Sequence, residues 1–168
     1  YINVMTYEMC SDGGYYQNAL YPHTSYNDSY NKIGRSMSSC SIQETITIYN
    51  NYGIPNSKLI FGVTFFGIIQ IKNNGTWVKE KSIAYTDLKN NYINNPDYVY
   101  VYDQTAQVPY LFSKDGLRFI SYDDPKSVAV KCQYILDTGC AGIMYWENGQ
   151  DLTDDLVGAM NTYLKGNK

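Results

Sequence analysis

Short apolar runs alternate with longer amphipathic segments along most of the chain. The runs at residues 1–8, 58–66 and 141–145 are bounded by turn residues and carry apolar side chains at successive positions. Such runs predict strands that are covered on both faces of a sheet. An alternation of strands with helices predicts a parallel α/β fold. The helices are expected over about 41–51, 124–138 and 152–164.

The expected helices have recognisable ends. Ser41 and Glu44 form the S-x-x-E pattern of a capping box, and Gly53 follows the end of the same helix. Asp124 places a carboxylate at the cap of the next helix, with Pro125 at its first position. The last helix is expected to bury one face, made by Leu152, Leu156, Ala159, Met160 and Tyr163.

Residues 68–120 interrupt this alternation. They contain short β-like runs at 98–102, 108–112 and 117–121 and a short helical pattern near 83–89. This pattern predicts a small α+β insertion between the second and third strands. The chain is therefore expected to divide into two fold segments, 1–67 and 121–168, separated by the insertion 68–120.

Three parallel strands are too few for a self-sufficient sheet. An open sheet of this size leaves unpaired edges, whereas a complete (β/α)8 barrel needs on the order of 250 residues. A small wound domain is the alternative, but no Gly-rich phosphate loop follows any of the three strands. The pattern favours part of a barrel.

The composition of the chain argues against nucleic acid and a membrane as partners. The net charge is −3, and the basic residues form no stripe that could follow phosphates, so nucleic acid is not an expected ligand. The longest apolar stretch, 59–69, is interrupted by polar and glycine positions and is too short to span a bilayer. A soluble domain without a membrane segment is therefore expected.

Two features bear on the compartment. The sequons at Asn27 and Asn74 fall where turn residues predict surface loops, which favours a secreted glycoprotein. The cysteine spacings lack the short C-x-x-C pairs of a structural zinc site, and neither a metal nor a cofactor is expected. Disulfides and buried free thiols both remain open for the four cysteines Cys10, Cys40, Cys132 and Cys140.

Four segments resemble one family in its own order and spacing. Residues 1–8, YINVMTYE, resemble the N-x-M-x-Y-D end of the sixth barrel strand in glycoside hydrolase family 18, the chitinase family. Residues 53–67 resemble its G-x-P-x-x-K-L-x-x-G-x-P-x-Y-G seventh strand. Residues 108–110 and 119–127 resemble its insertion and the start of its eighth unit, and 142–147 its eighth strand. The resemblance implies strands six to eight of a TIM barrel.

This resemblance also implies a chemistry and a set of site residues. Family 18 cleaves β-1,4-linked N-acetylglucosamine with the help of the substrate's own acetamido oxygen. Tyr7 would donate its hydroxyl to that oxygen, and Trp146 would form the floor under the sugar. Met5 would pack beneath it, and Glu8 would accept sugar hydroxyls or contact the catalytic acid. Phe66 would contribute to substrate binding at the position where a Tyr is usual.

The family's proton donor ends a D-x-x-D-x-D-x-E motif on the fourth strand, which would lie upstream of this chain. The nearest acidic cluster, 151–155, starts the last helix and is interpreted as its cap. The resemblance thus implies that the N-terminal part of the same barrel, together with chitin or N-acetylglucosamine oligosaccharides, is a partner of this chain.

Three departures keep an alternative open. Glu8 stands in place of Asp, Phe66 in place of Tyr, and Ile68 in place of an Arg. They favour a chitin-binding lectin on the same barrel, whereas the joint presence of Met5, Tyr7 and Trp146 favours the enzyme. A structural α/β fragment without a sugar site is the third interpretation.

Overall fold

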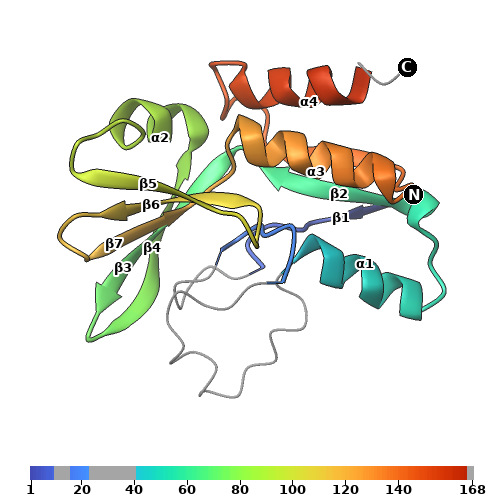
Figure 1. Ribbon diagram of the computed structural model, residues 1–168, viewed down its shortest axis with the longest axis horizontal. Helices are drawn as coiled ribbons and strands as arrows, with labels where there is room; N and C mark the ends of the chain where they lie inside the picture. The colour runs from blue at the N-terminus through green and yellow to red at the C-terminus, as the bar shows by residue number, and fades with distance from the viewer. Residues whose placement is uncertain (10–15, 23–40, 166–168) are drawn as a thin grey trace.

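The computed structural model describes residues 1–9, 16–22 and 41–165 (Figure 1). A first sheet consists of the strands β1 (Ile2–Val4), β2 (Leu59–Thr64) and β8 (Gly142–Trp146). They are parallel and lie in the order β1-β2-β8. The three expected strands are therefore adjacent, and their carboxyl ends meet at one edge of the sheet. The strand predicted over 1–8 is too long, because the chain leaves the sheet after Val4.

The helices between these strands begin where their caps predict. In α1 (Ile42–Asn51), Ser41 Oγ accepts the backbone N–H of Glu44 at 3.2 Å. In α3 (Pro125–Asp137), the Asp124 carboxylate accepts the N–H of Ser127, whose hydroxyl accepts the N–H of Asp124 in return. A short 3-10 turn, Asn56–Lys58, leads into β2. Both predicted helix starts are confirmed.

The last helix starts later than expected. α4 runs over Asp155–Lys165, and Asp151 caps it by accepting the backbone N–H groups of Leu156 and Val157. The predicted apolar face is correct for Leu156 and wrong for Leu152, which is 74% exposed because it lies in the turn before the helix. The acidic cluster at 151–155 serves the helix cap, as predicted.

A second, antiparallel sheet follows β2. Its strands are β3 (Phe66–Asn73), β4 (Thr76–Ala84), β5 (Tyr98–Asp103), β6 (Val108–Ser113) and β7 (Arg118–Ser121), in the order β4-β3-β7-β6-β5. The helix α2 (Tyr85–Asn91) connects β4 to β5. In Figure 1 this sheet lies beside the carboxyl end of β2, while α3 and α4 cover one side of the parallel sheet.

The sequence pattern did not predict the corner between the two sheets. The strand expected over 58–66 ends at Thr64, and Phe66 begins β3. Residues 59–69 form one apolar run because the chain is covered by packed elements on both sides of the corner, so hydrophobicity does not mark the turn. The strands β3 and β4 were not expected, and β4 carries no buried run because most of its residues are exposed. The helix predicted near 83–89 begins at Tyr85 and ends at Asn91.

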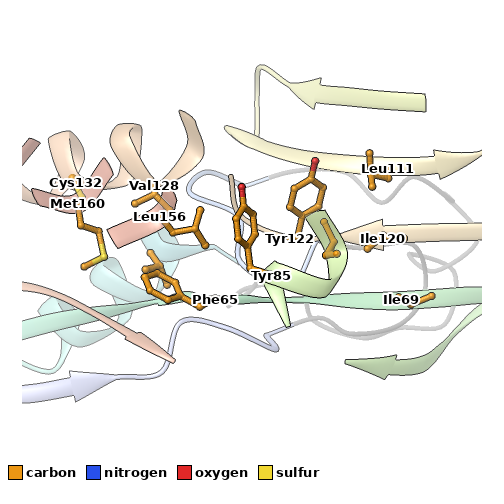
Figure 2. Packing of buried hydrophobic residues seen from close by; sticks show 12 residues of the cluster. Phe65, Ile69, Tyr85, Leu111, Ile120, Tyr122, Val128, Cys132, Leu156 and Met160 are labelled. Atoms are coloured by element: carbon orange, nitrogen blue, oxygen red, sulfur yellow. The ribbon is translucent and has the colours of Figure 1, made fainter. Parts of the chain in front are cut away.

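One hydrophobic cluster joins the two sheets (Figure 2). Phe65 and Tyr145 stack with ring centroids 4.2 Å apart, which connects the corner to β8. Figure 2 shows the antiparallel-sheet residues Leu111 and Ile120 on one side of Tyr85 and Tyr122, and residues of α3 and α4 on the other. The antiparallel sheet is therefore fixed against the parallel sheet through a shared core.

The described residues settle part of the cysteine question. Cys132 is buried and Cys140 half-buried, and both are free thiols. Cys10 and Cys40 lie outside the described residues, as does the sequon at Asn27. Asn74 occupies the tight turn between β3 and β4. No helix within the described ranges is long and apolar enough to cross a membrane, and those ranges hold no cluster of metal-ligating side chains.

Candidate functional site

A pocket of about 340 Å³ opens at the carboxyl ends of the parallel strands. Side chains reach it from the segment after β1, from the end of β8 and the turn after it, and from β3 and β4 of the antiparallel sheet, although these segments are far apart in the sequence. The residues that line it are Met5, Tyr7, Glu8, Phe66, Ser82, Trp146 and Gln150. The structure thus brings together all five residues predicted for the site and adds two others.

Tyr7 lies directly on the backbone of β2. A Cβ atom at position 62 would stand 2.4 Å from Cε1 of Tyr7, so only glycine leaves room for the ring there. The Tyr7 ring also meets Phe66 edge to face, with centroids 6.3 Å apart. Contacts on two sides fix the direction of the phenol.

The hydroxyl of Tyr7 is a hydrogen-bond donor at neutral pH. Partial burial raises the pKa of the Tyr7 phenol, and the negative charge of the adjacent Glu8 raises it further. An unperturbed tyrosine titrates near pH 10. Tyr7 therefore stays protonated over the whole physiological range.

The strand end that carries Tyr7 is held by the residue before it. Thr6 is buried, and its hydroxyl donates to Gly62 O at 2.8 Å and accepts from Gly62 N at 3.1 Å. The Asn18 amide donates to the carbonyl oxygens of Thr6 and Gly62. These hydrogen bonds satisfy backbone groups just past the end of β1 and fix the position of the backbone next to Tyr7.

Trp146 and Met5 present apolar surface at the pocket. The Trp146 carbonyl accepts the N–H of Phe65 at 2.7 Å, and the peptide bond from Trp146 to Glu147 is cis. Trp146 is 51% exposed and Met5 is 69% exposed, which is unusual for side chains of this size. The packing expected for Met5 is thus not made within the described part of the chain.

Glu8 is held at the rim of the pocket by a charged partner. Its backbone lies in the left-handed region, at φ 52°, which few non-glycine residues adopt. Its carboxylate oxygen Oε1 is 2.5 Å from Nζ of Lys79 on β4. This contact connects the end of β1 to the edge strand of the antiparallel sheet.

Ser82 and Gln150 were not predicted. Ser82 lies on β4 opposite Ile68, inside a strand that the sequence pattern did not reveal. The Gln150 amide donates to Glu147 Oε1 at 3.1 Å, and its own side-chain oxygen is buried without a partner among the described residues. Ser82 reaches the pocket only through the tertiary fold, whereas Gln150 lies in the turn that follows Trp146.

The comparisons with known proteins agree with this arrangement. Residues 1–151 match the model of the family described as Glycosyl hydrolases family 18. The chain belongs to this family. Its mixed α/β content fits the TIM-barrel fold of family 18, and the resemblance inferred from the sequence is confirmed.

The most similar relatives include bacterial chitinases. Chitinase A1 of Niallia circulans is 37% identical over 128 residues, which cover 67% of this chain and 18% of that protein. Chitinase B of Serratia marcescens is 26% identical and matched over 29% of its length. The chain therefore spans less than a third of these curated family 18 proteins.

Solved structures resemble the fold over nearly the whole chain. Chitinase ChiW from a Paenibacillus strain superposes with a TM-score of 0.83 at 28% identity, covering 98% of this chain and 15% of that one. Chitinase ChiA74 from Bacillus thuringiensis superposes with a TM-score of 0.81 at 27% identity, covering 99% of this chain and 32% of that one. A family 18 N-acetylglucosaminidase from Paenibacillus barengoltzii superposes with a TM-score of 0.77 at 28% identity, covering 98% of this chain and 48% of that one.

Behind the pocket, this family 18 chain buries a charged network that the sequence did not predict. Lys131 and Asp123 are fully buried, with Nζ and Oδ1 2.5 Å apart. Lys131 also donates to the backbone and side-chain oxygens of Asn18, and Asp123 accepts from Thr64 and Ser127. Burial lowers the pKa of Lys131, while the Asp123 carboxylate raises it. The network links α3 to the strand ends below the site.

Proposed function

We propose that the complete protein is a chitinase-like glycoside hydrolase that cleaves β-1,4-linked N-acetylglucosamine, and that this chain forms one side of its sugar site. The observation that carries the proposal is the convergence of Met5, Tyr7, Phe66 and Trp146 on one pocket at the strand ends. In a barrel of parallel strands, ligands bind at this face. Chitinases among the most similar relatives support the choice of substrate.

The reaction is substrate-assisted and retaining. The acetamido oxygen of the bound sugar attacks its own anomeric carbon while a protonated carboxylic acid releases the leaving sugar. Water then opens the cyclic intermediate, so the product keeps the β configuration. Tyr7 donates its hydroxyl to the acetamido oxygen and so holds the planar N–C–O unit in the orientation from which that oxygen reaches the anomeric carbon. This contribution is to positioning, and a misplacement of about 1 Å can lower a rate on the order of 100-fold.

The remaining pocket residues bind the sugar. The exposed indole of Trp146 forms a flat apolar floor, which suits the C–H face of a pyranose ring. Met5 packs under the same sugar, and Phe66 forms the wall behind Tyr7. Glu8 accepts hydrogen bonds from sugar hydroxyls. Because these groups hold the reacting centre in one orientation, they contribute to positioning as well as to affinity.

The proton donor belongs to the N-terminal part of the same barrel, in a D-x-x-D-x-D-x-E motif. Two features of this chain support a barrel completed in this way. β1 and β8 are the edge strands of the parallel sheet, and unpaired edges are normally covered in native proteins. Tyr1, Met5 and Trp146 expose large apolar side chains beside these edges. The segments 1–67 and 121–168 are then barrel segments, and 68–120 is an insertion between strands seven and eight.

Chitin is an extracellular polymer, so we place the protein outside the cell. The sequon at Asn74 lies in an exposed turn, where a glycan would meet no packed element. Neither nucleic acid nor a membrane is a partner in this proposal, and no cofactor takes part in the reaction.

A chitin-binding lectin on the same barrel is the second candidate. It is favoured by Phe66, which offers no hydroxyl to the sugar, and by Glu8, whose longer side chain places its carboxylate differently from an aspartate. The lectin would use Trp146 and Met5 as the same apolar floor without cleaving the bound chain.

One experiment separates the two candidates. The complete protein is incubated with the N-acetylglucosamine tetramer, and the products are followed by mass spectrometry and by proton NMR of the anomeric signals. The enzyme releases shorter oligomers that appear first in the β configuration. Binding of the tetramer without products supports the lectin, and products that appear first in the α configuration contradict the substrate-assisted retaining mechanism.

A further inference from the structure

Lys79 stands next to the proposed sugar site but does not line the pocket. It lies on β4, opposite Gln70 of β3, and its amine meets the Glu8 carboxylate at 2.5 Å. Glu8 does line the pocket. The two residues are 71 positions apart in the sequence, so the contact depends on how the antiparallel sheet docks against the end of β1.

We propose that Lys79 is a positioning residue of the sugar site, which holds the Glu8 carboxylate at the pocket rim so that it accepts hydrogen bonds from the sugar. This inference rests on the proposed function and names one further residue that acts in it. Lys79 itself contacts Glu8, and it reaches the substrate only through that carboxylate.

The Glu8 side chain needs an anchor. A glutamate has more rotatable bonds than an aspartate, and a free glutamate at a pocket rim would occupy several rotamers. Glu8 lies beyond the end of β1, and its backbone at φ 52° is outside the regular strand conformation. The ion pair with Lys79 selects one of these rotamers before the sugar arrives, which lowers the ordering cost of binding.

β4 is the element that supplies this charge. In the partner strand β3, Gln70 lies opposite Lys79, and Phe66 and Ile68 at the start of the strand are apolar and buried. β4 carries Lys79 and also Ser82, which pairs with Ile68 and lines the pocket. The edge strand of the antiparallel sheet therefore forms a polar wall of the site.

The ion pair between Lys79 and Glu8 contributes little to the stability of the fold. The Lys79 and Glu8 side chains are 37% and 44% exposed, and exposed ion pairs contribute little to folding. A structural role would show in the unfolding temperature, whereas a positioning role shows in substrate binding and turnover. The two roles are therefore separable by experiment.

The test uses the complete protein with the N-acetylglucosamine tetramer as the probe. Lys79→Met removes the charge and keeps the length of the side chain, and Lys79→Arg restores the charge. Lys81→Met is the matched control, because Lys81 is a neighbouring exposed lysine of the same strand and forms no ion pair within the described ranges. Glu8→Gln is made alone and together with Lys79→Met.

For a hydrolysing protein, we expect Lys79→Met to lower kcat/KM roughly tenfold, mainly through KM, with an unchanged Tm. Lys79→Arg should recover most of the loss, and Lys81→Met should match the wild type. Once Glu8→Gln is present, Lys79→Met should add little, because the two residues act as one unit. For a protein that binds without cleaving, the same pattern is expected in Kd.

The outcomes distinguish a failure of the role of Lys79 from a failure of the proposed function. Full activity or affinity in Lys79→Met, or losses that add in the double variant, would overturn the role of Lys79 and leave the proposed function standing. A parallel fall in Tm and activity, not recovered by Lys79→Arg, would assign Lys79 a structural role only. A wild-type protein that neither cleaves nor binds the tetramer would overturn the proposed function, and the role of Lys79 with it.

Discussion

Lys131 on α3 and Asp123, just past the end of β7, form an ion pair in which neither side chain is exposed. The pair holds more than its own two elements together. Through Asn18 it reaches Thr6 and Gly62, which lie immediately before and beneath Tyr7. A buried charge network thus supports the strand ends on which the candidate site is built.

Removing one member of this pair should destabilise the protein strongly. Lys131→Met leaves Asp123 as an uncompensated buried charge, which typically costs about 3–5 kcal/mol. The double variant Lys131→Met with Asp123→Asn should cost less than Lys131→Met alone, because no unpaired charge remains. The measurement is the urea unfolding midpoint of each variant.

Gln133→Met is the control for this series, since Gln133 lies on the exposed face of the same helix. It should change stability by less than about 0.5 kcal/mol. A loss in Lys131→Met as small as that of the control would show that the pair is solvated in solution.

Gly62→Ala tests the contact between β2 and Tyr7. The new methyl would stand 2.4 Å from the Tyr7 ring, so the ring must move away from the strand. A shift of about 1 Å at a catalytic group can lower the rate on the order of 100-fold. We expect such a fall in kcat/KM for the tetramer. Gly158→Ala, where a methyl meets no atom within 4 Å, should leave the kinetics unchanged. Equal kinetics in both variants would contradict the placement of Tyr7.

The ion pair between Lys89 on α2 and Asp155 on α4 should make the stability of the protein depend on pH in the acid range. Lys89 and Asp155 are 2.5 Å apart, and the hydrogen bond from Lys89 is the main cause that lowers the pKa of Asp155, against partial burial. A carboxyl whose pKa is lower in the folded state adds stability above its unfolded pKa, near pH 4, and loses it as the pH falls through the folded pKa.

The size of this effect is modest, because Lys89 and Asp155 are 40% and 30% exposed. We expect the wild type to have a higher Tm than Lys89→Met at pH 6, with a difference that shrinks towards pH 3. A difference in Tm that stays constant between pH 6 and pH 3 would show that Lys89 does not lower the pKa of Asp155.

Trp146→Ala tests the apolar floor of the sugar site. The side chain is half exposed, so its removal should cost little stability, yet it removes the surface on which the sugar rests. KM should rise and kcat should fall together, because binding and positioning both suffer. Tyr52→Ala removes another exposed aromatic ring, at the end of α1, and should have neither effect. Unchanged kinetics in Trp146→Ala would remove Trp146 from the site.

Local sequence signals predicted the parallel part of the fold well. Asp124 and Pro125 determine the start of α3 through bonds to residues within one helical turn, so no distant contact is needed. The strand ends carrying Tyr7 and Trp146 were predicted because the family motif ties each residue to a strand. The corner at Phe65 and Phe66 was not, since both sides of it are buried and equally apolar.

The sequence did not predict the roles of Lys131, Ser82 and Gln150, because these roles depend on the tertiary structure. Lys131 lies on an amphipathic helix, where a lysine normally faces solvent, and its burial depends on acceptors from Asn18 and Asp123. Ser82 reaches the pocket from β4 of the antiparallel sheet, and Gln150 reaches it from the turn after β8. Such sites arise from tertiary contacts that a single sequence does not display.

Tyr7→Phe in the complete protein tests the central claim most directly. The change removes one hydroxyl and little volume, so the ring should keep its contacts with Gly62 and Phe66, and the pocket should keep its affinity. What is lost is the hydrogen bond that orients the acetamido oxygen for its attack on the anomeric carbon. The steady-state kinetics of tetramer cleavage should show kcat lower on the order of 10²-fold with KM little changed. A variant that chiefly raised KM and kept kcat would make Tyr7 a binding residue and contradict its role in the assisted attack.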